Sequence, residues 1–485
     1  MSSAIEGLKP EPVWRYFAEV SRIPRGSRNE AAVAGYVMDT AKRLGLEAKQ
    51  DGSGNVLVKK PASPGREKAP SVALQGHLDM VCEKNADKVH DFMKDPIELV
   101  RKDNVLMANG TTLGADNGIG VATSLAIMED RSLVHGPLEF LFTVDEETGL
   151  TGATNLEPDF VDSRILLNLD TEEEGALYIG CSGGVDTLGN WKVDYKDAPS
   201  GCVTAQVKVA GLRGGHSGLD IDKGRGNAIK ILNRALMALD ALGARIVSVS
   251  AGSKHNAIPR EAGAVVLIPK KMIDEATSTV QQLATTLRAE VATVDPDLVV
   301  SLEKVEGKRK GKVIKKGVQR RLLLTLSALP HGVVKMSAEI PGLVETSTNV
   351  AVVNTTKKAI SVVTSQRSSV ASEIQEIAQT VASVLELGGA EVGNIHGYPG
   401  WKPNPDSAIV KLARVTYASM YGNEPHVKAV HAGLECGLLG EKYPAMDMVS
   451  IGPTLEAVHS PDEKMFVDTV EKFWNFLLAL LRNVG

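Results

Sequence analysis

A chain of 485 residues is too long for one ordinary hydrophobic core, so we expect two or three domains. Hydrophobic residues make up 43% of the chain and charged residues 23%, which is the balance of a soluble globular protein. The net charge of -5 argues against a nucleic-acid-binding protein, and no apolar run reaches the roughly 18 residues that a membrane span needs.

The N-terminal residues and the cysteines both indicate a cytoplasmic protein. The first 14 residues are polar and lack the apolar stretch of a signal peptide. The four cysteines form no CxxC pair, a pattern typical of reduced thiols rather than disulfides; they are Cys82, Cys181, Cys202 and Cys436. We therefore expect a soluble cytoplasmic protein with neither a membrane nor a nucleic acid as its partner.

The first part of the chain alternates predicted helices with short apolar strands. Residues 29–44 have apolar side chains at helical spacing, and the predicted helix ends before Gly45. Runs rich in Val, Ile, Leu and Phe predict strands at 55–59, 71–75, 138–144 and 165–169, with a helix at 118–128. This alternation predicts an α/β domain with a mixed, mostly parallel sheet flanked by helices.

The pattern changes after residue 184. The predicted strands are then 203–209, 245–251, 322–326 and 359–364, and the predicted helices are 226–242, 272–291 and 370–387. Beyond a Pro-rich loop near 397–405 follow a helix at 408–421, a strand at 447–451 and a helix at 467–481. We therefore expect residues 1–186 and 400–485 to form one α/β domain, and residues 187–399 to form a smaller, inserted α+β domain.

Two charged runs have ordinary interpretations. The basic run at 304–321 has no aromatic partners, which favours a solvated loop or helix face over a nucleic-acid site. The acidic run at 172–174 is likewise expected to face solvent.

Several predicted strands run directly into residues that can bind metals. These residues are His77, Asp79, Asp145, Glu146, Glu147, Asp170 and, after a loop, His459. In open α/β sheets, ligands gather beyond the carboxyl ends of the strands, so these side chains could meet at one edge. Asp116 lies near the start of the predicted helix at 118–128, where negative charge is favoured.

Each residue taken singly has a plainer explanation. A lone histidine is usually a structural hydrogen-bonding group, Asp116 could be a helix cap, and adjacent glutamates usually face solvent. Two histidines and several carboxylates at strand ends, with no cysteine among them, instead form a donor set that suits zinc or a similar divalent ion.

The spacing also suggests separate tasks. On an extended segment His77 and Asp79 point the same way, so Asp79 could orient the His77 ring. Glu146 and Glu147 diverge, so one can hold a metal while the other acts as a base. A carboxylate that bridges two ions about 3.5–4 Å apart would allow a shared water to ionise near pH 7.

The residues His77-Leu-Asp79, GADNG (114–118), Glu146-Glu147, Asp170 and His459 resemble the motif set of the aminoacylase/carboxypeptidase-type dinuclear zinc peptidases. Five longer stretches resemble, within that family, the Xaa-His dipeptidases. They are GHLDMVCEKN (76–85), GTTLGADNGIG (110–120), NLDTEEEG (168–175), HAGLECG (431–437) and MVSIGPTLEAVHSPDE (448–463). The resemblance extends over essentially the whole chain.

The resemblance implies a role for each predicted site residue. Two zinc ions per subunit are implied, with cobalt or manganese as alternatives. One ion would be held by His77 and Asp170, and the other by Glu147 and His459. Asp116 would bridge the ions, Glu146 would be the general base, and Asp79 would orient His77.

The inserted domain also contains segments similar to family motifs. His216, within GGHSG, matches a lid histidine that stabilises the oxyanion, often from a neighbouring subunit; a tight turn with an incidental histidine is the alternative. Asn256 and Arg367 match substrate-binding positions, and arginine suits a terminal carboxylate, although Arg367 could equally lie on the surface. Gly433, close to His431, lies in a motif near the site. A homodimer is implied by the resemblance alone.

The expected function is hydrolysis of dipeptides by a metal-activated bridging water with Glu146 as the base. Xaa-His dipeptides, including β-Ala-His, are the expected substrates. One alternative is another amidohydrolase of the same superfamily, such as an aminoacylase or a tripeptidase. A non-catalytic metal-binding protein is the other alternative, and the intact Glu146 argues against it.

Overall fold

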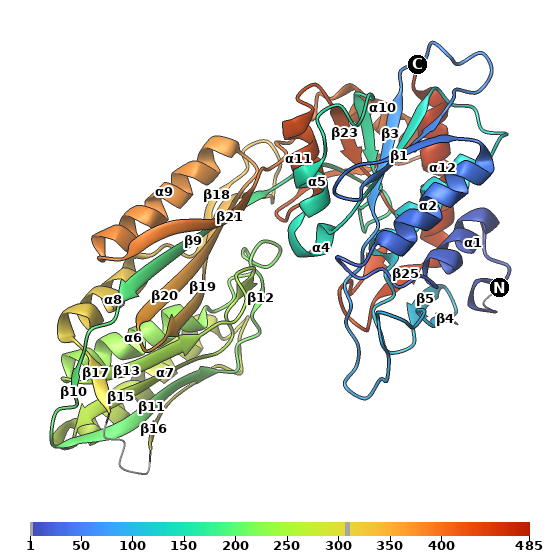
Figure 1. The fold of residues 1–485 in the computed structure, drawn as a ribbon. Coiled ribbons are helices and arrows are strands. Elements are labelled where there is room, and N and C mark those ends of the chain that lie inside the picture. The colour runs from blue at the N-terminus through green and yellow to red at the C-terminus, as the bar shows by residue number, and fades with distance from the viewer. Residues whose placement is uncertain (1–2, 306–310) are drawn as a thin grey trace. The chain divides into compact units, whose positions relative to one another are not determined.

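The computed structural model describes residues 3–305 and 311–485, which form two compact units (Figure 1). The first, called here the terminal unit, comprises Met1–Gly180, Trp401–Ala429 and Leu434–Gly485. The second, the inserted unit, comprises Cys181–Gly400 and Val430–Gly433. Among the described residues, no helix has the length and apolar character needed to cross a membrane.

The terminal unit is built on a mixed eight-stranded sheet. In spatial order its strands are β1 (Glu47–Gln50), β2 (Val56–Lys60), β6 (Leu138–Thr143), β3 (Val72–His77), β7 (Ile165–Asn168), β23 (Asp447–Ser450), β8 (Ala176–Cys181) and β22 (His426–Val430). The pairs β6–β3, β3–β7 and β7–β23 are parallel, whereas β1–β2, β2–β6 and β23–β8 are antiparallel. The predicted α/β class is confirmed, with the parallel pairs at the centre of the sheet.

Helices cover both faces of this sheet. They are α1 (Glu11–Val20), α2 (Ala31–Leu44), α3 (Ala115–Glu129), α4 (Glu146–Gly149), α5 (Thr151–Asn155), α10 (Ala408–Tyr421), α11 (Glu435–Lys442) and α12 (Val467–Asn483). Ala73 of β3 packs in one apolar cluster with Leu439 of α11. A Cβ added at Gly76 would point to the opposite face, where it would lie 2.2 Å from Asn117 Oδ1 of α3. As predicted, α2 ends at Gly45, whose φ of +73° is left-handed.

A small four-stranded sheet completes the terminal unit. Its strands are β24 (Leu455–Glu456), β25 (Lys464–Phe466), β5 (Val105–Ala108) and β4 (Leu99–Lys102). The antiparallel pair β24–β25 encloses the loop 457–463, which contains His459 and Glu463. The sheet therefore fixes both ends of a loop that carries a predicted metal ligand.

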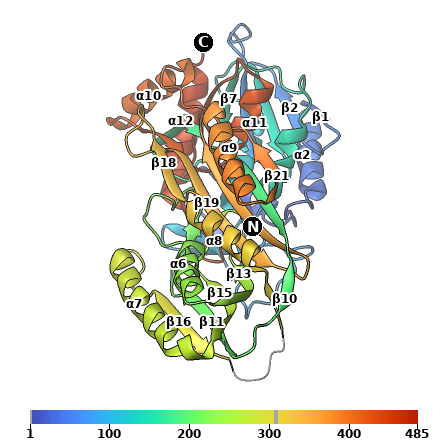
Figure 2. The same ribbon diagram turned by 90° about the vertical axis from the view of Figure 1, so that its left-hand side faces the viewer.

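The inserted unit has a nine-stranded sheet. The strands are β16 (Val299–Lys304), β11 (Cys202–Ala210), β15 (Ala262–Pro269), β13 (Arg245–Ala251), β19 (Val344–Thr355), β20 (Ala359–Ser368), β9 (Gly183–Lys192) and β21 (Glu391–Tyr398), with β18 (Gly332–Met336) paired to β19. Helices α6 (Ala228–Ala241), α7 (Ile273–Val291), α8 (Lys316–Ala328) and α9 (Ala371–Leu387) pack against it (Figure 2). Side chains from these strands and helices form one continuous core cluster.

The predicted strand at 322–326 is wrong, because these residues lie within α8. Leu322, Leu323 and Leu326 are buried while Leu324 is 45% exposed, which is the pattern of one helical face. Five mostly apolar residues do not distinguish a strand from a buried part of a helix. The basic run at 304–321 spans the end of β16, strand β17 (Lys312–Ile314) and the start of α8, and its residues 306–310 lie outside the described residues.

The acidic run is only partly solvent-facing. Glu172 is exposed, as expected. Glu173 forms an ion pair with Lys428 at 2.6 Å, and Glu174 accepts a hydrogen bond from Tyr417 Oη at 2.8 Å. The Glu173 side chain remains 39% exposed, whereas that of Glu174 is only 14% exposed, so the expectation of a solvated run was wrong for Glu174.

Candidate active site

The predicted ligands of the terminal unit lie beyond the carboxyl ends of neighbouring parallel strands. Strand β3 ends at His77, β6 is followed by Glu146 and Glu147 in α4, and β7 is followed by Asp170. Asp116 is the second residue of α3, and His459 lies in the β24–β25 loop. The groups of potential ligands in the described residues contain all five predicted metal ligands, with ligand atoms within 4.8 Å of one another in each group.

Asp116 lies between the two histidines. Its Oδ1 is 3.0 Å from His77 Nε2, and its Oδ2 is 3.0 Å from His459 Nε2. Asp170 Oδ1 lies 3.4 Å from His77 Nε2, and Glu147 Oε2 lies 3.0 Å from His459 Nε2. The cluster therefore consists of two halves, each with one histidine and one carboxylate, that share Asp116.

The carboxylates of this cluster perturb the pKa values of one another and of the histidines. Burial lowers the pKa of His459, but hydrogen bonds to Asp116 and Glu147 prevail and raise it to about 11. Burial opposes ionisation of Asp116, yet its two histidine partners hold the pKa of this carboxyl below its ordinary range. Burial raises the pKa of Asp170 to about 6. Such crowding of carboxylates in a partly buried site favours the binding of cations.

The residues present fit a pair of divalent cations. Glu147 Oε1 is buried and has no hydrogen-bond partner among the described residues. A buried carboxylate oxygen without a partner is costly unless a cation or a donor approaches it. The set of two imidazoles and three carboxylates is also the borderline nitrogen and oxygen donor set that suits zinc.

Asp79 holds the turn that carries Glu146. Its Oδ1 accepts a hydrogen bond from Glu146 N at 3.0 Å, and its Oδ2 accepts one from Glu147 N at 3.2 Å. Asp79 Oδ1 also lies 3.4 Å from His77 Nδ1, on the far side of the ring from Asp116. The spacing of the sequence suggested the contact with His77 but not the contacts with the two glutamates.

Glu146 lies beside this cluster. Burial raises its pKa well above the ordinary value; His77 opposes this rise, and the neighbouring Glu147 carboxylate adds to it. A carboxylate with a raised pKa accepts and holds a proton near neutral pH more readily than an ordinary glutamate does.

A buried polar network connects the strands behind the site. Glu435, the first residue of α11, is fully buried, and its Oε2 accepts hydrogen bonds from Gln75 Nε2 at 2.5 Å and Thr143 Oγ1 at 2.6 Å. Gln75 Oε1 in turn accepts one from Asn168 Nδ2 at 2.6 Å. The network links β3, β6 and β7 near the ends that carry the predicted ligands. Sequence reasoning missed it, although Glu435 lies in the HAGLECG motif.

The inserted unit brings a second set of predicted residues together around Arg367. This side chain is 6% exposed, so the alternative of a surface arginine does not hold. Its Nη1 donates to Tyr398 Oη at 2.8 Å, and its Nε lies 3.4 Å from Ser217 Oγ. Ser217 N donates to Asn256 O at 2.9 Å. Tyr398 and Ser217 were not predicted from the sequence.

His216 and Gly433 also belong to this unit. His216 Nδ1 accepts hydrogen bonds from Gly218 N at 3.2 Å and Leu219 N at 3.1 Å, which fixes the ring in a Gly-flanked turn. An added Cβ at Gly433 would lie 2.9 Å from the ring of Tyr398, so a larger side chain would displace that ring.

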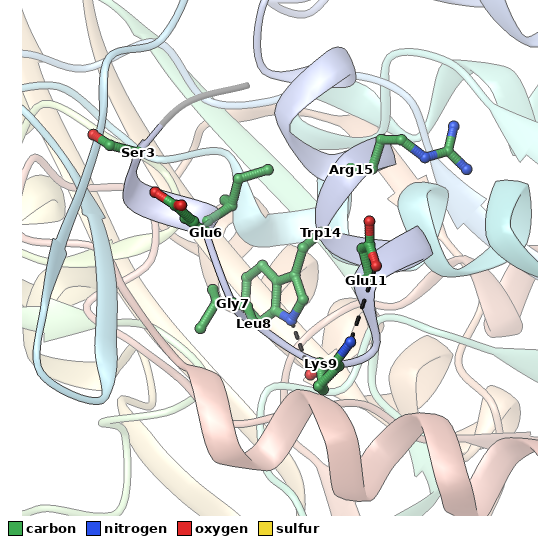
Figure 3. Close-up of a pocket in the computed structure, with 9 residues that line it drawn as sticks. Ser3, Glu6, Gly7, Leu8, Lys9, Glu11, Trp14 and Arg15 are labelled. Atoms are coloured by element: carbon green, nitrogen blue, oxygen red, sulfur yellow. Dashed lines mark hydrogen bonds and ion pairs between the residues drawn. The ribbon is translucent and has the colours of Figure 1, made fainter.

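A separate cavity of about 490 Å³ lies at the N-terminal segment and the start of α1 (Figure 3). Trp14 Nε1 donates to Lys9 O at 3.0 Å in its wall, and Lys9 forms an ion pair with Glu11 at 3.9 Å. None of the predicted site residues lines this cavity.

A carboxylate that lies between two histidines, beyond the carboxyl ends of the parallel strands of an α/β sheet, is typical of hydrolases with paired metal ions. Comparison with known proteins gives the particular family. The model of the family described as "Peptidase family M20/M25/M40" matches residues 73–483. The chain therefore belongs to this family of peptide hydrolases.

Individual relatives match this chain over its whole length. The cytosol non-specific dipeptidase of Escherichia coli (strain K12) is 40% identical over 483 residues, which are 99% of each chain. The crystal structure of aminoacylhistidine dipeptidase from Vibrio alginolyticus matches with a TM-score of 0.88 and 42% identity, covering 100% of this chain and 98% of that one. An aminopeptidase of Bacillus cereus shares the fold at 15% identity, with a TM-score of 0.57 and coverage of 98% and 99%.

Proposed function

We propose that this chain is a metal-dependent dipeptidase with two divalent cations in the cluster around Asp116. The observation that carries the proposal is that the two oxygens of Asp116 face different histidines, each at 3.0 Å. His77 and Asp170 would hold one ion, Glu147 and His459 would hold the other, and Asp116 would contact both. Zinc is the proposed metal, and cobalt or manganese could use the same donors.

The substrate class is inferred from the relatives. Both full-length relatives have names that specify dipeptides, one as non-specific and the other as acting on aminoacylhistidine. We therefore propose that Xaa-His dipeptides, including β-Ala-His, are among the substrates. A cytoplasmic location agrees with the name of the first relative and with four free cysteines among the described residues.

The residues around the proposed ions have distinct tasks. Cations held by His77, Asp170, Glu147, His459 and Asp116 would supply Lewis acidity for the scissile carbonyl and would lower the pKa of water towards 7. Glu146 accepts the proton of the attacking water and delivers it to the departing amine, a role that its raised pKa supports. Asp79 keeps Glu146 in place through the backbone N–H of the α4 turn.

The inserted unit supplies groups suited to bind the substrate. The buried Arg367 guanidinium suits the terminal carboxylate of a dipeptide, and Tyr398 Oη fixes its orientation. Because His216 Nδ1 accepts two backbone hydrogen bonds, the ring proton resides on Nε2 and is suited to stabilise an oxyanion. Asn256 and Gly433 complete the proposed substrate contacts.

A homodimer is also proposed, with His216 acting in its own subunit or in the neighbouring one. Light scattering at working concentration tests this part of the proposal separately. A dimeric mass is expected, and a monomeric mass would remove the possibility that His216 acts across subunits.

Hydrolysis assays test the proposed reaction. Zinc-loaded protein would be given β-Ala-His, other Xaa-His dipeptides, dipeptides without histidine, a tripeptide and an N-acetyl amino acid. Cleavage of dipeptides is expected, and Glu146→Gln should lower kcat by about 10²–10⁴-fold, because the amide cannot accept the proton. Cleavage of the N-acetyl amino acid alone would instead support an aminoacylase, and no cleavage by metal-loaded protein would overturn the proposed activity.

A further inference from the structure

Two buried charged side chains, which the reaction does not use, hold the loop that carries Asp116. Glu463 and Arg25 are each 2% exposed, and each contacts the backbone of the residues 113–116. A buried charge is costly unless it has strong hydrogen-bond partners, so the contacts of both side chains indicate what they stabilise.

Glu463 accepts hydrogen bonds from four successive backbone N–H groups. Its Oε2 accepts from Leu113 N at 2.7 Å and Gly114 N at 3.0 Å. Its Oε1 accepts from Ala115 N at 2.8 Å and Asp116 N at 3.4 Å. These N–H groups lie at the start of α3 and have no partner within the helix, so the carboxylate both satisfies them and fixes the path of the loop.

Arg25 holds the same loop through its carbonyl groups. Its Nη2 donates to Gly114 O, and its Nη1 donates to Leu78 O at 2.9 Å and Asp79 O at 2.8 Å. The guanidinium therefore joins the loop of Asp116 to the segment that follows His77. His77 and the shared Asp116 are therefore both positioned relative to this one side chain.

The glycines of the GADNG motif provide space for Arg25. An added Cβ at Gly114 or at Gly118 would lie 2.6 Å from Arg25 Nη2. Gly114 also has a φ of +68°, in the left-handed region that favours glycine. The motif thus includes two positions whose small size allows the arginine to reach the backbone.

Glu463 also belongs to the loop that carries His459. Both residues lie between β24 and β25, and Glu463 N donates to Ser460 O at 3.1 Å. The loop supplies one ligand directly, and through Glu463 it holds the loop of a second ligand. The position of Asp116 relative to His459 therefore depends on this carboxylate.

We propose that Glu463 and Arg25 are positioning residues that hold the 113–116 loop so that Asp116 faces both His77 and His459. This inference rests on the proposed metal centre. Neither side chain would touch a metal or the substrate. Loss of a group that orients a metal ligand typically weakens metal binding by about 10–100-fold, and we expect a change of this size.

The test is calorimetric titration of metal-free full-length protein with Zn²⁺, comparing the wild type with Glu463→Gln. The amide retains the size of the side chain, but its NH₂ group must face two backbone N–H donors. Glu139→Gln is the matched control. Glu139 is 3% exposed and accepts from Ser163 N at 2.7 Å and Asp162 N at 3.1 Å, near the start of β6 and away from its ligand-bearing end.

The two variants should separate structural support from positioning. Both should lower the thermal midpoint of the metal-free protein. Only Glu463→Gln should raise the Kd for Zn²⁺ by about 10–100-fold, with kcat recovering at saturating metal; Glu139→Gln should stay within about twofold of the wild type. An unchanged Kd for Glu463→Gln, or an equal loss in Glu139→Gln, would overturn the inference.

Arg25→Lys is the variant to test if Glu463→Gln fails to fold. Lysine retains the charge, but it lacks the fixed fork of donors with which arginine reaches three carbonyl groups. The same rise in Kd is expected, and an unchanged Kd would again overturn the inference. Wild-type protein that binds no divalent cation would overturn the proposed metal centre together with this inference. Tight binding by the wild type with no change in the variants would overturn this inference alone.

Discussion

Replacement of Glu435 by glutamine should change how the stability of the metal-free protein depends on pH. The carboxyl is fully buried and accepts hydrogen bonds from Gln75 and Thr143, and its second oxygen has no hydrogen-bond partner in the part of the chain that the structure describes. Burial raises its pKa from 4.5 to about 7. The folded state therefore binds a proton that the unfolded state has already lost between these two pH values.

The sign and the size of the effect follow from this difference. Stability contributed by the protonated carboxyl is fully present below pH 4.5 and is lost as the pH rises through about 7. At about 1.4 kcal/mol for each pH unit, the loss approaches about 3 kcal/mol. For a domain of about 150–250 residues, each kcal/mol shifts the thermal midpoint by about 2–4 °C.

The assay is thermal unfolding of metal-free wild type and Glu435→Gln at pH 5 and pH 8, followed by calorimetry. The wild type should lose several degrees more than the variant between the two pH values. Glu47→Gln is the control, because it removes the same charge from an exposed position on β1. An identical pH dependence in wild type and Glu435→Gln would refute the claim that this buried carboxyl titrates at a raised pKa.

Three further predictions follow from single contacts. Gly114→Ala should lower the free energy of unfolding by about 1–3 kcal/mol, because the added Cβ would overlap the Arg25 guanidinium. Gly45 is the control, because it has a similar φ and an added Cβ there would have no atom within 4 Å; Gly45→Ala should cost only about 1 kcal/mol in thermal unfolding. Burial lowers the pKa of Lys60 from 10.5 to about 8, so the stability should rise with pH between these two values. The thermal midpoint of the wild type should therefore be higher at pH 9.5 than at pH 7.5, and Lys60→Met should abolish this difference. Zn²⁺ at about 100 times its Kd should stabilise the metal-free protein by about 2.7 kcal/mol for each ion bound, and an equal gain in Asp116→Ala would contradict the assigned site.

The elements that carry the proposed metal ligands could be predicted because their signals are local. An apolar run followed by His77, or by Asp170, marks a buried strand that ends in a polar group. The rule that ligands gather beyond the carboxyl ends of parallel strands then predicts which of these groups meet. The helix α8 was mistaken for a strand because its apolar residues form only a short run after a charged stretch.

The residues that support the ligands could not be predicted in this way. Glu463 is hydrogen-bonded to the backbone N–H of Leu113, 350 positions away in the chain, and a backbone partner leaves no mark on the sequence. Glu435 likewise binds Gln75, 360 positions away. A glutamate within a motif is equally compatible with a solvated side chain, and only the fold distinguishes the two cases.

Titration of the metal-free protein with Zn²⁺ tests the central claim most directly. Two ions per chain are predicted for the wild type and for Glu146→Gln, because Glu146 is not a proposed ligand. Asp116→Ala should lose tight binding of both ions, because its two oxygens face the two histidines. A single ion in the wild type, or two ions bound with unchanged affinity by Asp116→Ala, would contradict a site in which two cations share this carboxylate.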